Sequence, residues 1–277
     1  MKTMGKEEIG LSNNFVFQEV MSDERVAILF LEALLGKKIS KIKYIGTERN
    51  EKTDILAHGI RLDVYIEDGL DTVYNIEMQQ LKDYLERRSR YYQSGIDRIT
   101  LTAGANYDEL RESFVIFVCS FDYYGKGDAK YERTSYINHD QSIPFDDGSH
   151  VIFLNAMYKD ASQIDPAIAE FLDLVRANNV ETLFKSDLAK AAANVVKRVR
   201  ADKGKVVRYM TLEMEMLNRE NFGRRRGRAE GRAEGRADFA KLTTKLIALG
   251  RIDDLAQAAK DEAKMEELFA EFGLTHS

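Results

Sequence analysis

Residues 60–79 have the sequence IRLDVYIEDGLDTVYNIEMQ, in which two apolar runs flank a polar turn that contains glycine. The runs, 60–66 and 73–79, are rich in β-branched and aromatic residues and alternate in polarity. This pattern predicts two antiparallel strands joined by a hairpin turn. Because the side chains of a strand point alternately to its two faces, one face of the first strand is expected to carry Leu62, Val64 and Ile66.

Two carboxylates occupy matching positions in this hairpin. If the chain turns about Leu70, Asp63 lies opposite Glu77, with Cβ atoms about 5 Å apart. Two like charges at this distance repel unless a cation lies between them, and carboxylate oxygens suit a hard divalent ion such as Mg²⁺. Gln79 shares their face and could orient a water molecule, so the pattern predicts metal-assisted hydrolysis of a phosphodiester. The alternative is a solvated sheet face whose polar side chains contact only water.

The flanking sequence predicts an α/β fold. Residues 15–35 have helical apolar spacing, with a polar break at 22–24 and a C-cap at Gly36. The elements expected next are a strand, a helix and a strand buried on both faces, at 39–45, 81–103 and 114–121. Helix, antiparallel strands, helix and buried strand together form a compact α/β core with one crossover connection.

The order of these motifs resembles a known nuclease superfamily. An Asp on one strand followed by Glu-x-Gln on the next, here Asp63, Glu77 and Gln79, is similar to the PD-(D/E)XK pattern. The ordered set RLDVYI, NIEMQ and RRSRYYQSGI resembles the Rpn family of recombination-promoting nucleases and transposases. FLEALLG before this set, ANYDELRESFVIFVCSFD after it and the glycine-period tail add to the resemblance, which covers most of the chain.

The resemblance implies a restriction-endonuclease-like core, with a mixed central sheet and flanking helices, followed by an all-helical C-terminal extension. It also implies a metal-dependent DNA endonuclease that is linked to recombination or transposition. Mg²⁺ or another divalent cation would be held by Asp63 and Glu77. Gln79 would be the third catalytic residue, at the position where most of the superfamily has a lysine.

Several positions depart from the family pattern. Glutamine cannot supply the positive charge of a lysine, although it can hold water or a phosphate oxygen by a hydrogen bond. The family's opening helix commonly begins with Asp-x-x-Phe-Lys, where this chain has Asn14, Phe17 and Gln18. Superfamily members often add an acidic residue from this helix, and the candidates here are Glu19 and Glu32. The departures leave open an alternative, a catalytically weak or inactive nucleic-acid-binding or assembly protein on a degenerate nuclease fold.

The net charge of −5 averages two unlike parts of the chain. Residues 186–228 contain 12 Lys or Arg and 5 Asp or Glu, a local charge of +7, so the remainder carries −12. Such a segregated basic segment is compatible with DNA as a partner, since it can release counterions from the phosphate backbone. A solvated helix surface is the alternative. The candidates for phosphate or DNA contact are Arg88, Tyr92, Lys197 and Arg198.

The second half of the chain is expected to be helical. Helices are predicted from about residue 162, with Asp165 before Pro166 as an N-cap, then with Asp187 as a cap, and over 205–222. Residues 223–238 repeat glycine at every fourth position, and four glycines destabilise a helix by about 4 kcal/mol relative to alanine. Three interpretations of the repeat are open: it forms a flexible linker, it forms a helix that packs on a partner in a homo-oligomer, or its arginines contact phosphate groups. The predicted division is a nuclease core, a helical extension, the repeat and a small helical tail, at 1–160, 161–222, 223–238 and 239–277.

Other classes of protein receive no support. The four histidines have no zinc-ligand spacing, and the sequence has no glycine-rich phosphate loop or serine nucleophile elbow. The single cysteine, Cys119, lies in an apolar run and excludes an internal disulfide. No apolar stretch approaches the roughly 20 residues of a membrane span, and the N-terminus lacks the apolar core of a signal peptide. A cytoplasmic protein without a membrane partner is expected.

Overall fold

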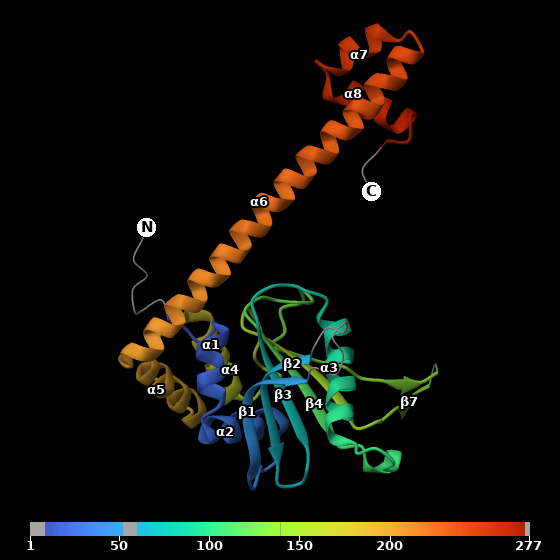
Figure 1. Ribbon diagram of the computed structural model, residues 1–277. Helices are drawn as coiled ribbons and strands as arrows, with labels where there is room; N and C mark the ends of the chain where they lie inside the picture. The colour runs from blue at the N-terminus through green and yellow to red at the C-terminus, as the bar shows by residue number, and fades with distance from the viewer. Residues whose placement is uncertain (1–8, 52–59, 139, 275–277) are drawn as a thin grey trace. The chain divides into compact units, whose positions relative to one another are not determined.

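The computed structural model describes residues 9–51, 60–138 and 140–274. A mixed six-stranded sheet with the strand order β1-β2-β3-β4-β8-β5 forms its centre (Figure 1). Strands β1, β2 and β3 are antiparallel neighbours, β3, β4 and β8 are parallel, and β5 is antiparallel to β8. The strands of this sheet are β1 (Ile42–Glu51), β2 (Ile60–Asp68), β3 (Val73–Gln79), β4 (Ser113–Cys119), β5 (Lys130–Glu132) and β8 (Ser149–Asn155). The predicted α/β fold is confirmed.

Two short helices precede the sheet, and the break between them lies where the sequence predicts it. α1 (Asn14–Met21) is followed by α2 (Glu24–Leu35), because the Asp23 carboxylate accepts a hydrogen bond from a backbone N–H in the first turn of α2. α2 ends at Gly36, whose φ of 65° is a left-handed conformation that glycine adopts without steric cost.

Helices cover both faces of the sheet (Figure 1). α1, α2, α4 (Pro166–Ala177) and α5 (Asp187–Ala201) lie on one face, over a core that includes the buried Ile66 and Ile76. α3 (Leu85–Thr100) lies on the other face, over the buried Tyr65, Tyr92 and Phe117. Both faces of β3 and β4 are therefore buried, as expected for the parallel centre of such a sheet.

The predicted alternation of β2 holds for Val64 and Ile66 but is wrong for Leu62. Leu62 packs with Tyr65 on the α3 side of the sheet, rather than with Val64 and Ile66. The pairing of β2 with β3 ends at Val64 and Ile76, so Leu62 lies beyond the segment in which β3 fixes the orientation of β2. Leu62 is still paired with Arg49 of β1, so the alternation fails where β2 has a strand partner on one side only.

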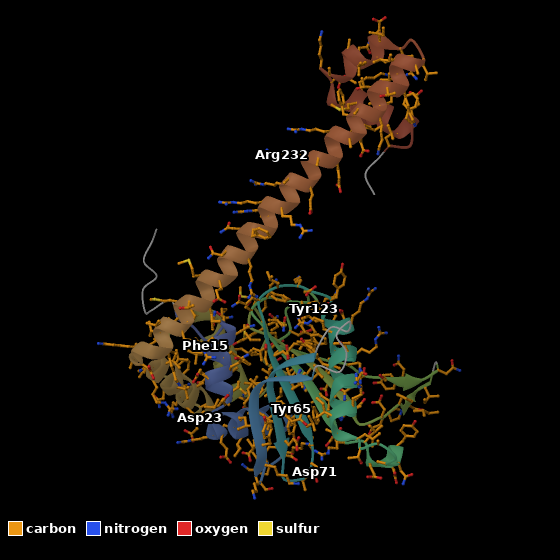
Figure 2. All side chains as sticks on the ribbon, viewed as in Figure 1. Phe15, Asp23, Tyr65, Asp71, Tyr123 and Arg232 are labelled. Atoms are coloured by element: carbon orange, nitrogen blue, oxygen red, sulfur yellow. The ribbon has the colours of Figure 1, made fainter. Side chains whose placement is uncertain are left out.

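α3 is the crossover that connects β3 to β4. The two strands are parallel, and their final residues, Gln79 and Cys119, are paired. Figure 2 shows Asp71, in the β2–β3 turn, and Tyr123, which follows β4, at opposite ends of the sheet. Ligands of open sheets with parallel strands bind at the carboxyl ends of those strands. The edge of the sheet that contains Gln79 is therefore the expected place for a site.

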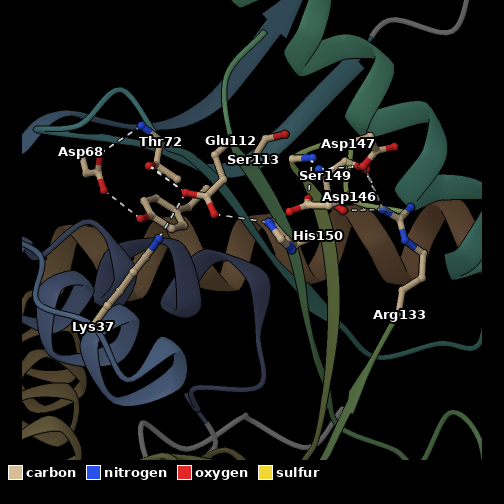
Figure 3. Close-up of polar contacts among 12 residues, drawn as sticks. Lys37, Asp68, Thr72, Glu112, Ser113, Arg133, Asp146, Asp147, Ser149 and His150 are labelled. Carbon is tan, nitrogen blue, oxygen red and sulfur yellow. Dashed lines mark hydrogen bonds and ion pairs between the residues drawn. The ribbon is translucent and has the colours of Figure 1, made fainter. Parts of the chain in front are cut away.

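At the opposite end of the strands from Gln79, charged and hydrogen-bonding side chains form a network (Figure 3). Glu112, just before β4, forms an ion pair with Lys37 at 3.3 Å, and Nε2 of His150 lies at the same distance from its carboxylate. In the β2–β3 turn, the Tyr74 hydroxyl donates a hydrogen bond of 2.8 Å to Asp68. These contacts join the amino ends of β3, β4 and β8 to the loop after α2. A separate two-stranded sheet, β6 (Tyr136–Ile137) with β7 (Asp140–Pro144), lies between β5 and β8 in the sequence.

The chain divides into two compact units, Met1–Tyr209 and Met210–Ser277. α4 begins with Asp165 as its N-cap, as predicted. At α5 the predicted cap is wrong, because Ser186 rather than Asp187 is the N-cap and its hydroxyl accepts a hydrogen bond from a backbone N–H of the first turn. Asp187 is instead the first helical residue, where its charge is favourable to the helix dipole. The boundaries predicted at residues 160, 222 and 238 stay predictions.

The glycine repeat is helical. It lies within α6 (Lys203–Ala248), so the predicted helix over 205–222 is confirmed as part of a longer one, while the choice between a linker and a helix that packs on a partner stays a prediction. Alanine, arginine and glutamate between the glycines are strong helix formers, and Arg226 pairs with Glu230 one turn away at 2.6 Å. A Cβ atom at any of the four glycines would meet no heavy atom of the described residues within 4 Å. Figure 2 shows the side chains along this helix, with Arg232 labelled.

Two short helices complete the second unit. α7 (Ile252–Ala258) and α8 (Glu262–Glu271) follow α6, so the tail predicted at 239–277 is helical and consists of the end of α6 and two further helices. They share a small apolar cluster with the last turns of α6, formed by Leu242, Leu246, Ala258 and Leu268. Among the described residues, no helix combines the length and the apolar character that a membrane span requires.

Candidate active site

Asp63 and Glu77 lie next to each other at the end of the β2–β3 ladder. The ladder pairs Val64 with Ile76, which confirms the predicted register, and Asp63 and Glu77 are the next residues of each strand. The backbone N–H of Asp63 donates a hydrogen bond of 3.0 Å to Oε1 of Glu77. Glu77 is only 1% exposed, whereas Asp63 is partly exposed. The pair therefore presents one buried and one accessible carboxylate.

Two amide side chains of β3 flank the Glu77 carboxylate. Because residues two apart share a strand face, Asn75 and Gln79 lie on either side of it. Asn75 Nδ2 donates to Glu77 Oε1 at 3.1 Å, and Gln79 Nε2 donates to Glu77 Oε2 at 3.5 Å. The Asn75 Oδ1 atom is buried and has no hydrogen-bond partner among the described residues. Strand alternation alone puts Asn75 on the same face as Glu77, but the sequence contains no signal for the contact between the two side chains.

Arg88 brings a positive charge into the site from α3. Its Nη1 donates a hydrogen bond of 2.7 Å to Gln79 Oε1, and its Nη2 lies 3.4 Å from Glu77 Oε2. Nη2 also lies 2.6 Å from the hydroxyl of Tyr92, one helical turn further along. The structure thus brings together five of the residues singled out from the sequence, Asp63, Glu77, Gln79, Arg88 and Tyr92.

Burial and mutual repulsion perturb the acid–base properties of these groups. Burial, and next the negative charge of Asp63, raise the pKa of the Glu77 carboxyl to about 7. Burial, and next the charge of Glu77, raise the pKa of the Tyr92 hydroxyl, which is therefore neutral at pH 7. A buried carboxyl with a raised pKa beside a second carboxylate gains stability when a cation neutralises the pair.

The opening helix contributes a glutamine to the site rather than an acid. Gln18 Nε2 lies 3.5 Å from Asp63 Oδ1. Glu19 points to another side of α1 and pairs with Lys205 at 2.5 Å, because consecutive helical residues differ by about 100° in direction. Glu32 pairs with Lys38 at 2.8 Å in the loop after α2 and accepts a backbone hydrogen bond there. The structure does not bring either glutamate to Asp63.

The basic residues of α5 form ion pairs with neighbouring elements. Lys197 pairs with Glu181 at 2.9 Å, and Arg198 pairs with Asp23 at 2.7 Å. Asp23, labelled in Figure 2, lies between α1 and α2. The contacts of Lys197 and Arg198 are therefore with these acids and not with the residues around Glu77. Their local positive charge is partly neutralised within the fold.

The oxygen atoms of the site fit a hard divalent cation held by few protein ligands. Among the described residues, no group of three or more His, Cys, Asp or Glu side chains is arranged so that it could hold a metal ion by itself. Three of the four histidines, His58, His139 and His276, lie outside the described residues. Mg²⁺ commonly binds through one or two carboxylates and completes its coordination with water and substrate phosphate. Asp63 and Glu77 supply such a pair, and the unpartnered Asn75 Oδ1 is a further oxygen on the same face.

The comparison with known families agrees with this geometry. The chain belongs to the PD-(D/E)XK nuclease family transposases, since the sequence model of that family matches residues 11–223. The match runs from the segment before α1 into the glycine repeat, and it includes every residue described around Glu77. Family membership supports a nuclease-like function on a fold with a mixed sheet and flanking helices. No curated protein and no solved structure matches the chain.

Proposed function

We propose that the protein is a Mg²⁺-dependent endonuclease that hydrolyses phosphodiester bonds of DNA and serves recombination or transposition. The observation that supports this function most directly is the pair of Asp63 and Glu77, joined by a 3.0 Å hydrogen bond at the end of two neighbouring strands. Membership of a nuclease and transposase family gives the reaction class. DNA is the substrate that such a family favours, and Arg88 of α3 adds a positive charge at the site.

Asp63 and Glu77 would hold the cation, each through carboxylate oxygens. When bound, a divalent cation polarises a phosphodiester and lowers the pKa of a water molecule that attacks it. Asp63, the more exposed of the two, would meet the substrate side, whereas the buried Glu77 is fixed by its contacts with Asn75 and with the Asp63 N–H. This difference in exposure makes Glu77 the rigid ligand of the pair.

Gln79 and Arg88 would together replace the lysine that most of the superfamily has at the position of Gln79. The Gln79 amide can hold the attacking water by hydrogen bonds but has no charge. Arg88, whose Nη1 lies 2.7 Å from Gln79 Oε1, would supply the positive charge that stabilises negative charge on the phosphate oxygens. The Tyr92 hydroxyl contacts Arg88 Nη2 and would fix the direction of the guanidinium. The positive side-chain charge of the site would therefore come from Arg88 on α3, instead of from a lysine on β3.

A plasmid assay tests the proposal. Wild-type protein with Mg²⁺ is expected to nick or linearise supercoiled DNA, to stop when a chelator is added, and to recover when Mg²⁺ is returned. Asp63→Ala is expected to abolish cutting under all three conditions, because one carboxylate then remains to hold the cation. Equal cutting by the Asp63→Ala variant would show that the hydrolysis has another origin.

A second candidate function is favoured by one contact. The Arg88 guanidinium lies 3.4 Å from Glu77 Oε2, so it competes with a cation for that oxygen. A nucleic-acid-binding or assembly protein on a degenerate nuclease fold would keep this ion pair permanently. Calorimetric titration with Mg²⁺ separates the two functions, since a nuclease site binds the ion and loses this binding in Glu77→Ala, whereas a degenerate site gives no heat in either protein.

A further inference from the structure

The solvent side of α3 differs in composition from the side that faces the sheet. The buried side carries Leu85, Ser89, Tyr92, Gln93 and Ile96. The opposite side carries two exposed aromatic residues and three exposed arginines, Tyr84, Arg87, Arg90, Tyr91 and Arg98, which are called the α3 face below. The acids of α3 have other surroundings: Glu86 accepts a hydrogen bond from the Tyr123 hydroxyl, and Asp97 is partly buried. Positive charge and aromatic surface are therefore concentrated on one side of this helix.

The arginines of the α3 face form no ion pair with any residue that the structure describes. Over the described ranges of the chain, Arg87, Arg90 and Arg98 have no acidic side chain within ion-pair distance. Lys197 and Arg198 on α5 each have one. An exposed guanidinium without an internal carboxylate partner is available for a phosphate group. On α3, next to Arg88, these three arginines therefore carry positive charge that no described carboxylate neutralises, in contrast to Lys197 and Arg198 of α5.

Tyr84 is held in an unusual backbone conformation at the start of α3. Four non-glycine residues in the described part of the chain have a positive φ, and three of them are Asp or Asn, which adopt it readily. Tyr84 is the fourth, with a φ of 43°, and a bulky residue is strained there. The residue is 70% exposed, and the Arg87 guanidinium lies 5.6 Å from the centre of its ring. Burial in the core therefore does not account for this strained aromatic residue.

The α3 face adjoins the candidate active site. Arg88 lies on the same helix between Arg87 and the buried side, and its guanidinium reaches Gln79 and Glu77. A strand of nucleic acid that follows the α3 face would pass beside these groups. Exposed arginines contact phosphates of any nucleic acid, whereas an exposed aromatic ring stacks on a base when the base is unpaired.

We propose that the α3 face binds single-stranded DNA, with the Tyr84 ring stacked on an unpaired base, so that the substrate at Asp63 and Glu77 carries unpaired nucleotides. The substrate part of this inference rests on the proposed nuclease function, while the binding part does not. The arginines account for affinity through phosphate contacts, and Tyr84 accounts for the preference for a single strand over a duplex.

Binding without metal tests the inference separately from cleavage. Fluorescence anisotropy of a labelled DNA strand, alone and annealed to its complement, is measured on full-length protein in EDTA. Wild type is expected to bind the single strand more tightly than the duplex. Tyr84→Ala is expected to weaken single-strand binding by about 5-fold to 100-fold, the range for one base–aromatic stack, and to leave duplex binding unchanged. Tyr84→Phe keeps the ring and is the matched control, with wild-type binding expected.

Salt dependence tests the arginines. The triple variant Arg87→Gln, Arg90→Gln, Arg98→Gln is expected to lower the slope of log K against log salt by about 2, at about 0.7 for each single-strand phosphate contact. The double variant Lys197→Gln, Arg198→Gln measures the contribution of α5, which is expected to be smaller. Thermal unfolding of each variant establishes that it is folded.

Three results would overturn the inference: wild-type single-strand binding by Tyr84→Ala, an equal loss of duplex binding in that variant, or a larger loss in the α5 variant than in the α3 variant. None of them bears on the proposed nuclease, which fails only if wild type does not cut or Asp63→Ala does. Conversely, a protein that shows the expected binding and never cuts DNA would retain the α3 face and lose the proposed function.

Discussion

Replacing Glu77 by glutamine is expected to stabilise the metal-free protein at alkaline pH although it removes a proposed metal ligand. Glu77 is 1% exposed, and its burial together with the charge of Asp63 raises its pKa from 4.5 to about 7. Above pH 7 the folded protein therefore holds a buried charge that the unfolded chain holds in water. Glutamine has nearly the same shape and no charge, so it imitates the protonated carboxyl.

The magnitude follows from the two pKa values. Below pH 4.5 the carboxyl is protonated in both states and pH has no effect through this group. Between pH 4.5 and 7 the unfolded chain releases its proton first, so the free energy of unfolding falls as the pH rises, and above pH 7 the loss is complete. The difference between 4.5 and about 7, at 1.36 kcal/mol for each pH unit, corresponds to about 3 kcal/mol. Glu77→Gln is expected to recover up to this amount at pH 8.

Urea unfolding followed by tyrosine fluorescence measures the effect. All 13 tyrosines lie before residue 210 and the chain has no tryptophan, so the signal reports on the first unit alone. Unfolding in EDTA at pH 5 and pH 8 is compared for wild type, Glu77→Gln and Asp71→Asn, which removes an exposed acid at the opposite end of the hairpin. For wild type and Asp71→Asn, the free energy of unfolding is expected to be lower at pH 8 than at pH 5. For Glu77→Gln, this decrease is expected to be absent. Identical pH dependences of wild type and Glu77→Gln would refute the electrostatic description of the site.

Further changes test other parts of the molecule. Arg88→Gln is expected to lower kcat for DNA cleavage by about 100-fold, with a smaller effect on KM. Arg88→Lys is expected to retain part of the activity, because lysine keeps the positive charge without the planar guanidinium. Steady-state kinetics measures both variants, and an unchanged kcat in Arg88→Gln would contradict the role of Arg88. Alanine at the four repeat glycines is expected to stabilise α6 by up to about 1 kcal/mol for each substitution, since the added Cβ atoms meet open space. Thermal unfolding followed by circular dichroism measures this. Loss of an oligomer in light scattering would instead support close packing of these helices against a partner. Asp23→Ala is expected to lower the free energy of unfolding by about 1 kcal/mol, because it removes the α2 cap and the Arg198 ion pair; an unchanged urea midpoint would show that neither contact stabilises the fold.

Local sequence signals predicted the hairpin and the helix ends that position the site. The register about Leu70 required only the alternation of strands and a short turn, and it places Asp63 beside Glu77 as expected. The N-cap at Asp165 and the glycine at the end of α2 depend on backbone chemistry within a few residues. Features of this kind are determined locally and are therefore accessible to sequence reasoning.

Contacts between distant segments were not accessible in this way. The contact between Arg88 and Gln79 depends on how α3 packs on the sheet. The ion pair between Glu19 and Lys205 joins residues that are far apart in the chain. The neutralisation of Lys197 and Arg198 has the same origin, since a count of charges along the sequence contains no information about their partners. The side chain of Leu62 turns to the other face where β2 loses β3 as a partner and keeps only β1, and the sequence pattern does not mark that point.

The central claim is that Asp63 and Glu77 hold a divalent cation for phosphodiester hydrolysis, and one measurement tests it most directly. Initial rates of plasmid nicking are compared across a Mg²⁺ titration for wild type, Asp63→Ala and the matched control Asp71→Ala, which removes an exposed aspartate from the far end of the same hairpin. Saturable, Mg²⁺-dependent nicking by wild type and Asp71→Ala, with none by Asp63→Ala, is the predicted result. Equal rates for Asp63→Ala and wild type, or nicking that does not depend on Mg²⁺, would contradict the claim.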